Sequence, residues 1–340
     1  MSENLAEAWD GLLDEFRAVG GIAENVRLAE GAYGRGVFPV DPERPIRILI
    51  PQASTIAVAD TMLRDGELVV RPGAARKKDT RFFDNYQRHF GWSAGGREFS
   101  LALQGAWHEL PADVVDFLKA TCALEDIERR FVAPTDESAL QDYARSRVFL
   151  LGGRQRFVPL IDMVNHRATA DGYLVSDLVG VEGTFDGEVF VSYNKLFDAI
   201  SVALSWGFAD QAAIANCLAV NGELENGLEF TIARAINQSR EVGGLALPNV
   251  EIGKKHFKLS FLTLGNLTDP LAPRATFREL MRPLMEEAEA DQVFDTIVSY
   301  NQEQLLHLLS LARKYDQPLA RMLANAALNQ LKVLGVNPDC

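Results

Sequence analysis

The stretch RFVPLIDMVNHRATADGY, from Arg156 to Tyr173, is the most informative part of this sequence. It opens with an apolar run that is typical of a buried strand. The run ends in Asp162 and then in an adjacent amide and imidazole, Asn165 and His166. Burying either polar group without a hydrogen-bond partner is costly. The pair therefore needs specific partners, and the surrounding sequence indicates what they are for.

Length and composition indicate an ordinary globular protein. The chain has 340 residues, of which 47% are hydrophobic and 24% are charged. Such a chain can bury a large core and form two or three structural units. No apolar run approaches the roughly 20 residues that span a bilayer, and the acidic, amphipathic N-terminus is unlike a secretory signal or a transit peptide. We expect a cytoplasmic protein that does not bind membranes.

Charge and cysteine usage argue against several classes of function. A formal net charge of −13 is unlike a dedicated nucleic-acid-binding protein, because neutralising phosphates requires a cationic face. It is compatible with a basic protein as partner. Cys122, Cys217 and Cys340 suit a reducing compartment, since they form neither a disulfide framework nor a cysteine-rich zinc site. No set of histidines, cysteines and carboxylates has ligand spacing, so we expect no metal.

Hydrophobic periodicity alternates between β and helical character along the first half of the chain. We expect an opening amphipathic helix capped by Ser2, followed by short strands that include residues 46–51. The pattern is helical over about 55–149, with Thr135 as the cap of the last helix. From Arg156 the pattern returns to that of strands.

The second half begins with a predicted helix at 194–208 and two predicted strands at 228–236 and 256–264. A turn-rich linker follows, and residues 276–335 predict about three amphipathic helices. Together these patterns predict five regions: an N-terminal helix with the first β segments at 1–54, a helical insertion at 55–145, further β segments at 146–215, a β-containing stretch without a fold assignment at 216–270, and a helical domain at 271–340.

Taken singly, the polar motifs have ordinary explanations. No G-x-S-x-G sequence is present, so a serine hydrolase is not indicated. The sequence GRG at 34–36 is too short for a dinucleotide-binding fingerprint, and a tight turn explains it. A single histidine at a strand end, such as His166, is most often a structural residue with its hydrogen bonds satisfied.

Taken in order, the motifs resemble the SET-domain methyltransferases, particularly the Rubisco large-subunit methyltransferase-like branch. The matching segments are FRAVGGIAENVRLAEGAYGRGVFPV (16–40), SRVF (146–149), VPLIDMVNH (158–166), GEVFVSY (187–193) and LSWGF (204–208). The resemblance implies an α+β fold: a SET-domain β-fold of short sheets with a knot-like crossing, split by a helical insertion and followed by a C-terminal helical domain. It also implies an S-adenosylmethionine-dependent protein-lysine N-methyltransferase that acts on a protein substrate.

The resemblance assigns cofactor-binding roles to two segments. Asn165 and His166 match the pair that is threaded beneath a later segment and contacts S-adenosylmethionine. Gly34, Arg35 and Gly36 match the loop that covers the methionine part of the cofactor, where glycine permits close approach of the backbone. Hydrogen-bonded partners at a strand end remain the structural alternative for the pair.

The resemblance also assigns roles in catalysis and substrate binding. Tyr193 matches the catalytic tyrosine, whose hydroxyl orients the amine. Ser146, Arg147 and Asp162 match residues that help to build the substrate-lysine site, although Arg147 and Asp162 could equally form a structural ion pair. Tyr173 matches another active-site tyrosine across a variable loop, and a half-buried tyrosine in a strand is an equal alternative.

Three departures from the family pattern leave alternatives open. Asn194 follows the catalytic position where the family commonly has glycine, Asp198-Ala199 replace its Ser-Asn pair, and Trp206 stands in the usual Tyr-Gly-Phe motif. The indole of Trp206 has one donor and no acceptor, whereas a phenol has both. It could narrow the amine channel, favour another nucleophile such as histidine, or leave a protein-binding module without catalysis. The sequence predicts neither the protein substrate nor the oligomeric state.

Overall fold

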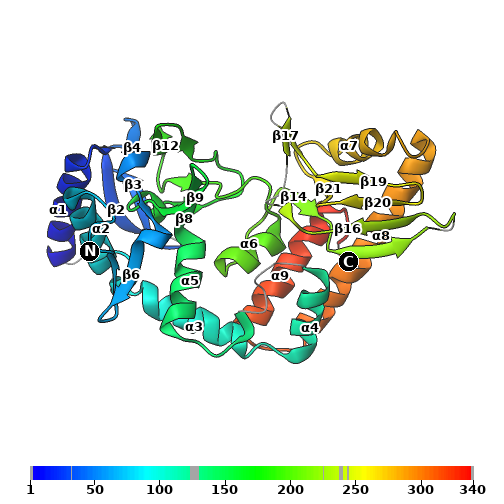
Figure 1. Cartoon of the computed structure of the whole chain (residues 1–340), viewed down its shortest axis with the longest axis horizontal. Helices are drawn as coiled ribbons and strands as arrows, with labels where there is room; N and C mark the ends of the chain where they lie inside the picture. Colours follow the sequence, from blue (N-terminus) through cyan, green and yellow to red (C-terminus); the bar gives the residue numbers. More distant parts are fainter. Residues whose placement is uncertain are drawn as a thin grey trace. The chain divides into compact units, whose positions relative to one another are not determined.

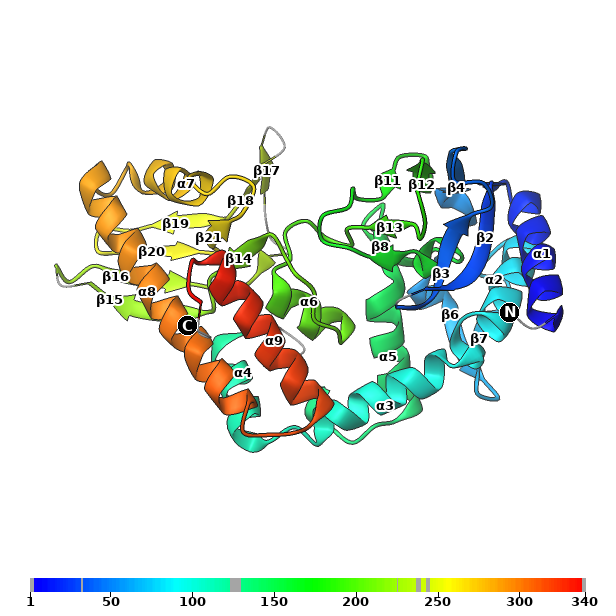
Figure 2. The ribbon, with the colours of Figure 1, turned by 180° about the vertical axis from the view of Figure 1, so that it is seen from behind.

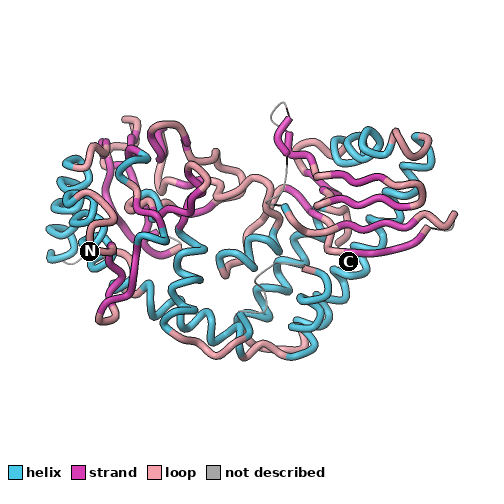
Figure 3. The backbone as a smooth tube through the Cα atoms, viewed as in Figure 1, coloured by secondary structure: helices cyan, strands magenta, loops and turns pink. Residues whose placement is uncertain are grey.

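A computed structural model describes residues 3–31, 33–122, 130–224, 226–236, 240–242 and 245–337 (Figure 1). The chain forms two compact units: unit 1 comprises residues 1–104 and 134–195, and unit 2 comprises residues 105–133 and 196–340. Helices and strands occur in both units (Figure 3), so the predicted mixture of α and β structure is confirmed. Ser2 and Cys340 lie outside the described residues.

The largest sheet of unit 1 has four antiparallel strands in the order β1-β4-β12-β11. These strands are β1 (Ile22–Glu24), β4 (Ile46–Pro51), β11 (Leu174–Val175) and β12 (Leu178–Gly183). The predicted strand at 46–51 is therefore confirmed as β4, and it lies in the middle of the sheet.

Smaller pairings surround this sheet. The antiparallel ones are β2 (Val26–Gly31) with β3 (Gly34–Pro39), β6 (Thr61–Arg64) with β7 (Glu67–Val70), and the three-stranded order β5 (Ile56–Ala57), β9 (Arg154–Phe157), β8 (Val148–Leu151). The short strands β10 (Asn165–His166) and β13 (Phe190–Val191) pair in parallel. The helices are α1 (Glu3–Ala18), α2 (Lys77–His89), α5 (Asp136–Arg147) and α3 (Gly96–His108), the last of which runs on into unit 2.

The core of unit 1 forms where the apolar face of α1 meets the sheet and α2. Trp9, Leu12 and Phe16 of α1 are buried in one cluster with Ile48 of β4 and Val179 of β12. The i, i+3 and i+7 spacing of these α1 residues places them on one face of the helix, as predicted. Thr135 caps α5 by accepting a hydrogen bond from the backbone of Ser138, so the predicted cap is confirmed.

Two predicted secondary structures differ in unit 1. Helix does not begin near Thr55, because residues 56–70 form β5, β6 and β7, and α2 begins at Lys77. The apolar run after Arg156 leaves strand conformation at Phe157: Leu160 has a φ of 76°, and a 3-10 turn, η5 (Ile161–Met163), follows. The prediction that this apolar run forms a strand was wrong beyond Phe157, because a continuously buried apolar run does not by itself distinguish a strand from a turn.

Unit 2 contains a four-stranded sheet in the order β15-β16-β20-β19, in which β16 and β20 are parallel. The strands of the unit are β14 (Ile214–Asn216), β15 (Val220–Glu223), β16 (Glu229–Ile232), β17 (Arg240–Val242), β18 (Leu245–Leu247), β19 (Val250–Ile252), β20 (His256–Leu259) and β21 (Thr263–Asn266). Its helices are α4 (Ala112–Thr121), α6 (Ala199–Trp206), α7 (Ala272–Met281), α8 (Glu287–Ala312) and α9 (Pro318–Val333). The predicted run at 256–264 is split between β20 and β21.

The C-terminal helices and the sheet share one core in unit 2. The helices α8 and α9 lie side by side (Figure 2). Phe257 of β20 contacts Phe277 of α7, which in turn contacts Phe294 of α8, with ring centroids 6.2 and 5.5 Å apart. The prediction of about three helices over 276–335 is confirmed by α7, α8 and α9, and their apolar faces pack against strands as well as against each other.

Candidate functional site

The Asn-His pair obtains its partners from a strand that lies later in the chain. Asn165 aligns with Phe190 and His166 with Val191 in the parallel pairing of β10 with β13. Two residues after this strand, the backbone N–H of Tyr193 donates to Nδ1 of His166 at 3.0 Å. A neutral imidazole that accepts at Nδ1 carries its proton on Nε2. The pair is therefore held by the same segment that ends in the predicted catalytic tyrosine.

The Asn165 amide is oriented by two acceptors from different parts of unit 1. Its Nδ2 donates to the Arg35 carbonyl at 3.2 Å and to Oε1 of Glu188 at 2.6 Å. Both donor hydrogens of the amide are thereby used, which fixes the direction of the amide oxygen. Asn165 is thus connected to the β2–β3 hairpin and to the segment that precedes β13.

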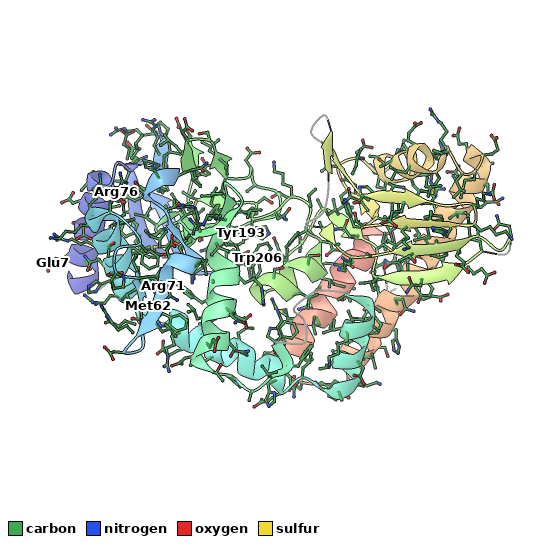
Figure 4. The ribbon with its side chains drawn as sticks, viewed as in Figure 1. Glu7, Met62, Arg71, Arg76, Tyr193 and Trp206 are labelled. Atoms are coloured by element: carbon green, nitrogen blue, oxygen red, sulfur yellow. The ribbon has the colours of Figure 1, made fainter. Side chains whose placement is uncertain are left out.

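The Tyr193 hydroxyl lies next to the backbone of the Asn-His segment. The hydroxyl of Tyr193, which Figure 4 labels, donates to the carbonyl of Val164 at 2.9 Å. The Tyr193 and His166 rings lie 4.9 Å apart. Burial raises the pKa of Tyr193 well above its ordinary value, an effect that the Arg147 charge partly opposes. At neutral pH the phenol is therefore protonated and acts as a hydrogen-bonding group rather than as a base.

Two more aromatic rings line the same region. An isolated parallel bridge pairs Gly172 with Ser192, which brings the next residues, Tyr173 and Tyr193, together. Their rings are stacked with centroids 6.3 Å apart, and Phe149 meets Tyr173 edge-on at 4.6 Å. Burial also raises the pKa of Tyr173. Tyr173 is half-buried just before β11, and the structure brings it to the predicted catalytic residue.

The buried Asp162 side chain lies close enough to the partly exposed Arg147 to form an ion pair. Arg147 Nη1 lies 3.8 Å from Asp162 Oδ2, and the Tyr86 hydroxyl donates to Asp162 Oδ1 at 2.5 Å. The Arg147 guanidinium also covers the Tyr143 ring at 4.8 Å. Ser146 uses its hydroxyl to donate to the carbonyl of Tyr143 in its own helix. These contacts are those of the structural alternative, and the substrate-binding roles of Ser146, Arg147 and Asp162 stay predictions.

Gly34, Arg35 and Gly36 begin strand β3 and do not form the predicted loop. The reason is that the hairpin pairing of β2 with β3 starts at once, with Gly31 opposite Gly34. Gly34 has a φ of 88°, a conformation that L-residues with a side chain rarely adopt. The Arg35 guanidinium donates to the carbonyl of Ala94 at 3.2 Å.

Gly31 and Gly36 are needed for space rather than for conformation. A Cβ atom on Gly36 would lie 2.3 Å from Oε1 of Glu188 and 3.0 Å from Nδ2 of Asn165. A Cβ atom on Gly31 would lie 2.2 Å from Oε2 of Glu188. The two glycines of the hairpin therefore leave a hollow that the Glu188 carboxylate enters. Sequence reasoning assigned no role to Glu188, although it follows Gly187 in the matching segment GEVFVSY.

Glu188 also lines a cavity of unit 1 with a volume of about 1100 Å³. The cavity is lined by Arg167, residues 169–174 and 181–188, Phe190, Val191 and Lys195. This volume is ample for a ligand of nucleoside size. A carboxylate beside glycines at the wall of such a cavity fits a ligand with a small cationic group, which S-adenosylmethionine has.

Three of the residues that depart from the SET-domain sequence pattern lie in unit 2: Asp198, Ala199 and Trp206. The ring of Trp206, which Figure 4 labels, packs on Phe197. The two ring centroids are 5.3 Å apart. Asp198 caps α6, accepts hydrogen bonds from the Ser201 and Asn216 backbones, and forms a fully buried ion pair with Arg234 at 2.5 Å. Asp198 thus has a structural role, and the predicted part of Trp206 in substrate binding stays a prediction.

Two kinds of feature are absent from the described ranges, namely clusters of metal ligands and membrane-spanning helices. There, three or more histidine, cysteine or acidic side chains do not come together in a way that could hold a metal ion. Within the same ranges, no helix combines the length and the apolar character needed to cross a membrane.

Comparisons with known proteins give distant similarities. No family model matches the chain. An uncharacterized protein of Aquifex aeolicus (strain VF5) is 26% identical over 111 residues, which cover 32% of this chain and 91% of that protein. Among solved structures, the SET domain of LSMT bound to lysine and AdoHcy is 13% identical with a TM-score of 0.42, and Rubisco LSMT bound to sinefungin and monomethyllysine is 11% identical with a TM-score of 0.41. Both alignments cover 98% of this chain and 90% of the solved chain.

Proposed function

We propose that this protein is an S-adenosylmethionine-dependent methyltransferase that modifies a lysine amine of a protein substrate. The observation that carries the proposal is the placement of Tyr193 against the Asn165–His166 pair. The phenol hydroxyl contacts the carbonyl that precedes the pair, and the backbone of Tyr193 contacts His166. The matching motifs around these residues occur in the order found in SET-domain methyltransferases.

The aromatic region around Tyr193 has the properties that an attacking amine requires. A lysine ammonium has an ordinary pKa of about 10.4 and no lone pair. Burial beside the rings of Phe149, Tyr173 and Tyr193 disfavours its charged form and so promotes deprotonation. S-adenosylmethionine, when bound, supplies a methyl group on a positively charged sulfur. Residues that hold the amine in line with this group provide much of the acceleration by positioning.

Tyr193 would act through hydrogen bonding. Its buried phenol stays protonated at neutral pH and donates to Val164. A hydroxyl oxygen also has lone pairs and can accept from an amine N–H. The Val164 hydrogen bond fixes the phenol and thereby the direction of the amine. Asn165 and His166 would contact the cofactor, as their matching positions imply.

Two measurements test the proposal. Isothermal titration of the purified chain with S-adenosylmethionine should give saturable heat. Incubation with a labelled methyl donor and a cell lysate should label at least one protein, with mass spectrometry placing the methyl group on lysine. Absence of both binding and transfer would refute the proposal, whereas a methyl group on histidine would correct the nucleophile.

A second candidate is a protein-binding module of the same fold that has lost catalysis. It is favoured by Asn194 and Trp206, which replace residues that the family commonly has at these positions. The lysate experiment distinguishes the two candidates. A binding module would still give heat on binding S-adenosylmethionine in the titration, but it would transfer no methyl group to any protein. We place the protein in the cytoplasm under either candidate, with a protein substrate for the enzyme and a protein partner for the module.

A further inference from the structure

We infer that Glu188 binds the α-ammonium group at the amino-acid end of S-adenosylmethionine. The inference rests on the proposed function and adds to it the residue that selects this end of the cofactor. Glu188 was not among the residues predicted to bind the cofactor. Four features of its surroundings support the assignment: space, hydrogen bonding, charge and access to a cavity.

The hairpin glycines leave the space that the Glu188 carboxylate occupies. Oε1 lies where a side chain on Gly36 would be, and Oε2 lies where a side chain on Gly31 would be. Neither glycine has a positive φ, so its conformation alone does not require glycine. Glycine at positions 31 and 36 therefore makes room for the Glu188 carboxylate. This carboxylate lies between the β2–β3 hairpin and the segment before β13.

The hydrogen bond from Asn165 ties Glu188 to the predicted cofactor pair. Asn165 Nδ2 donates to Glu188 Oε1 at 2.6 Å. A carboxylate has about four acceptor sites, so this single bond leaves further capacity on the same group. An ammonium has three N–H donors and forms strong, charge-assisted hydrogen bonds with a carboxylate. A sulfonium has no N–H to donate, so the geometry selects the amino-acid end of the cofactor.

The charges around Glu188 favour a cationic ligand. Among the described residues, Glu188 forms no ion pair. The two cations of the cavity wall have other contacts, because Lys195 lies 3.4 Å from Asp171 and Arg167 stacks on the Phe190 ring at 3.8 Å. A half-buried carboxylate without a cation is stabilised when a positively charged ligand binds beside it.

The experiment compares three ligands that share the adenosyl group. S-adenosylmethionine has both the ammonium and the sulfonium, S-adenosylhomocysteine has the ammonium only, and 5′-methylthioadenosine has neither. Titration calorimetry with the full chain measures each affinity for the wild type, for Glu188→Gln and for Asp186→Asn. Glutamine keeps an acceptor for Asn165, and Asp186 is an exposed carboxylate of the same cavity wall that serves as the charge control.

We expect Glu188→Gln to weaken binding of S-adenosylmethionine and S-adenosylhomocysteine by about 10- to 100-fold, the range for a hydrogen bond to a charged group. Binding of 5′-methylthioadenosine should not change, and Asp186→Asn should bind all three ligands almost as the wild type does. Thermal unfolding of each variant confirms that the fold is retained.

Three results would overturn the inference in distinguishable ways. If the wild type binds the ammonium-bearing ligands and Glu188→Gln binds them equally well, the inference fails while the proposed function stands. If Glu188→Gln weakens all three ligands equally, Glu188 only orients Asn165 and does not bind the ammonium. If the wild type binds neither S-adenosylmethionine nor S-adenosylhomocysteine, the proposed function itself fails.

Discussion

At the scale of single residues, the site combines buried polar groups with different tasks. The backbone N–H of Tyr193 donates a hydrogen bond to the His166 ring. The Asn165 amide connects the β2–β3 hairpin to Glu188, and Asp162 forms an ion pair with Arg147. Each group has a partner from a segment distant in sequence. Removing one member should therefore affect either binding, transfer or stability, and these effects can be separated.

Tyr193→Phe should lower the rate of methyl transfer and leave cofactor binding nearly unchanged. The variant loses the hydrogen bond to Val164 and with it the group that directs the amine. A loss of positioning of this kind costs about a hundredfold in rate. Single-turnover transfer to the labelled lysate protein measures the effect, with Tyr300→Phe on helix α8 as a control. An unchanged rate would show that the phenol does not direct the nucleophile.

Asp162 should make the free energy of unfolding depend on pH. Burial raises the pKa of Asp162 from 3.8 to about 6 in the folded protein, an effect that the Arg147 charge opposes. Between these values the folded protein holds the proton more tightly than the unfolded chain does. The stabilisation is therefore complete below about pH 4 and is lost as the pH rises through 6, by about 3 kcal/mol in total.

Asp162→Asn removes this titration. Urea denaturation at several pH values between 4 and 7 should show that the difference in unfolding free energy between wild type and variant changes over this interval. Parallel pH curves for the two proteins would contradict the shifted pKa. Because the folded protein favours the neutral side chain at this position, the variant, which carries a neutral amide, should gain stability relative to the wild type as the pH rises from 4 to 7.

At the scale of elements, the β2–β3 hairpin brings glycines to the Asn-His pair for two different reasons. Gly34 has a positive φ and open space where a Cβ would lie, whereas Gly36 has an ordinary conformation and the Glu188 carboxylate against it. The two positions therefore form a matched pair for mutation. One tests backbone conformation, and the other tests the space that the carboxylate occupies.

Gly36→Ala should weaken cofactor binding more than it weakens the fold. The new Cβ would lie 2.3 Å from Oε1 of Glu188, so the carboxylate must move away from Asn165. Gly34→Ala should instead cost about 1 kcal/mol of stability through its positive φ and leave binding intact. Calorimetry and thermal unfolding on both variants measure the contrast. Equal effects on binding would show that the hairpin glycines do not act through Glu188.

At the scale of the whole molecule, long-range polar contacts hold each unit together. In unit 2, Arg234 joins Asp198 at the start of α6 to the backbone carbonyls of Asn216 and Cys217 near β14. Both charged side chains are about 1% exposed or less. Burial also raises the pKa of the nearby Cys217 thiol to about 12, so this cysteine is protonated at neutral pH and packs as an apolar residue.

Arg234→Met should destabilise the protein strongly, by about 3–5 kcal/mol, because it leaves the Asp198 carboxylate buried without a cation. Arg321→Met is the matched control: Arg321 lies 2.6 Å from Asp316, but both side chains are mostly exposed. An exposed pair contributes only about 0–1 kcal/mol. Chemical denaturation measures both values. A small effect at Arg234 would show that the buried pair is not needed for stability.

Much of the fold could be predicted where local patterns decide it. The helix α1, the strand β4, the Thr135 cap and the three C-terminal helices all follow from periodicity or from capping residues. The strands at 56–70 and the turn at Leu160 did not follow, because short strands carry little periodic signal and a buried apolar run fits several conformations. The hairpin start at Gly34 was likewise mistaken for a loop.

For the site, the sequence by itself determined which residue types are present and in what order, from the hairpin glycines through Asn165 and His166 to Tyr193. Only the tertiary structure decided that the Tyr193 hydroxyl meets the carbonyl of Val164 and that Glu188 enters the space left by Gly31 and Gly36. The physical reason is that these contacts join segments far apart in the chain. Strand pairing and burial bring such segments together, and neither has a local signature.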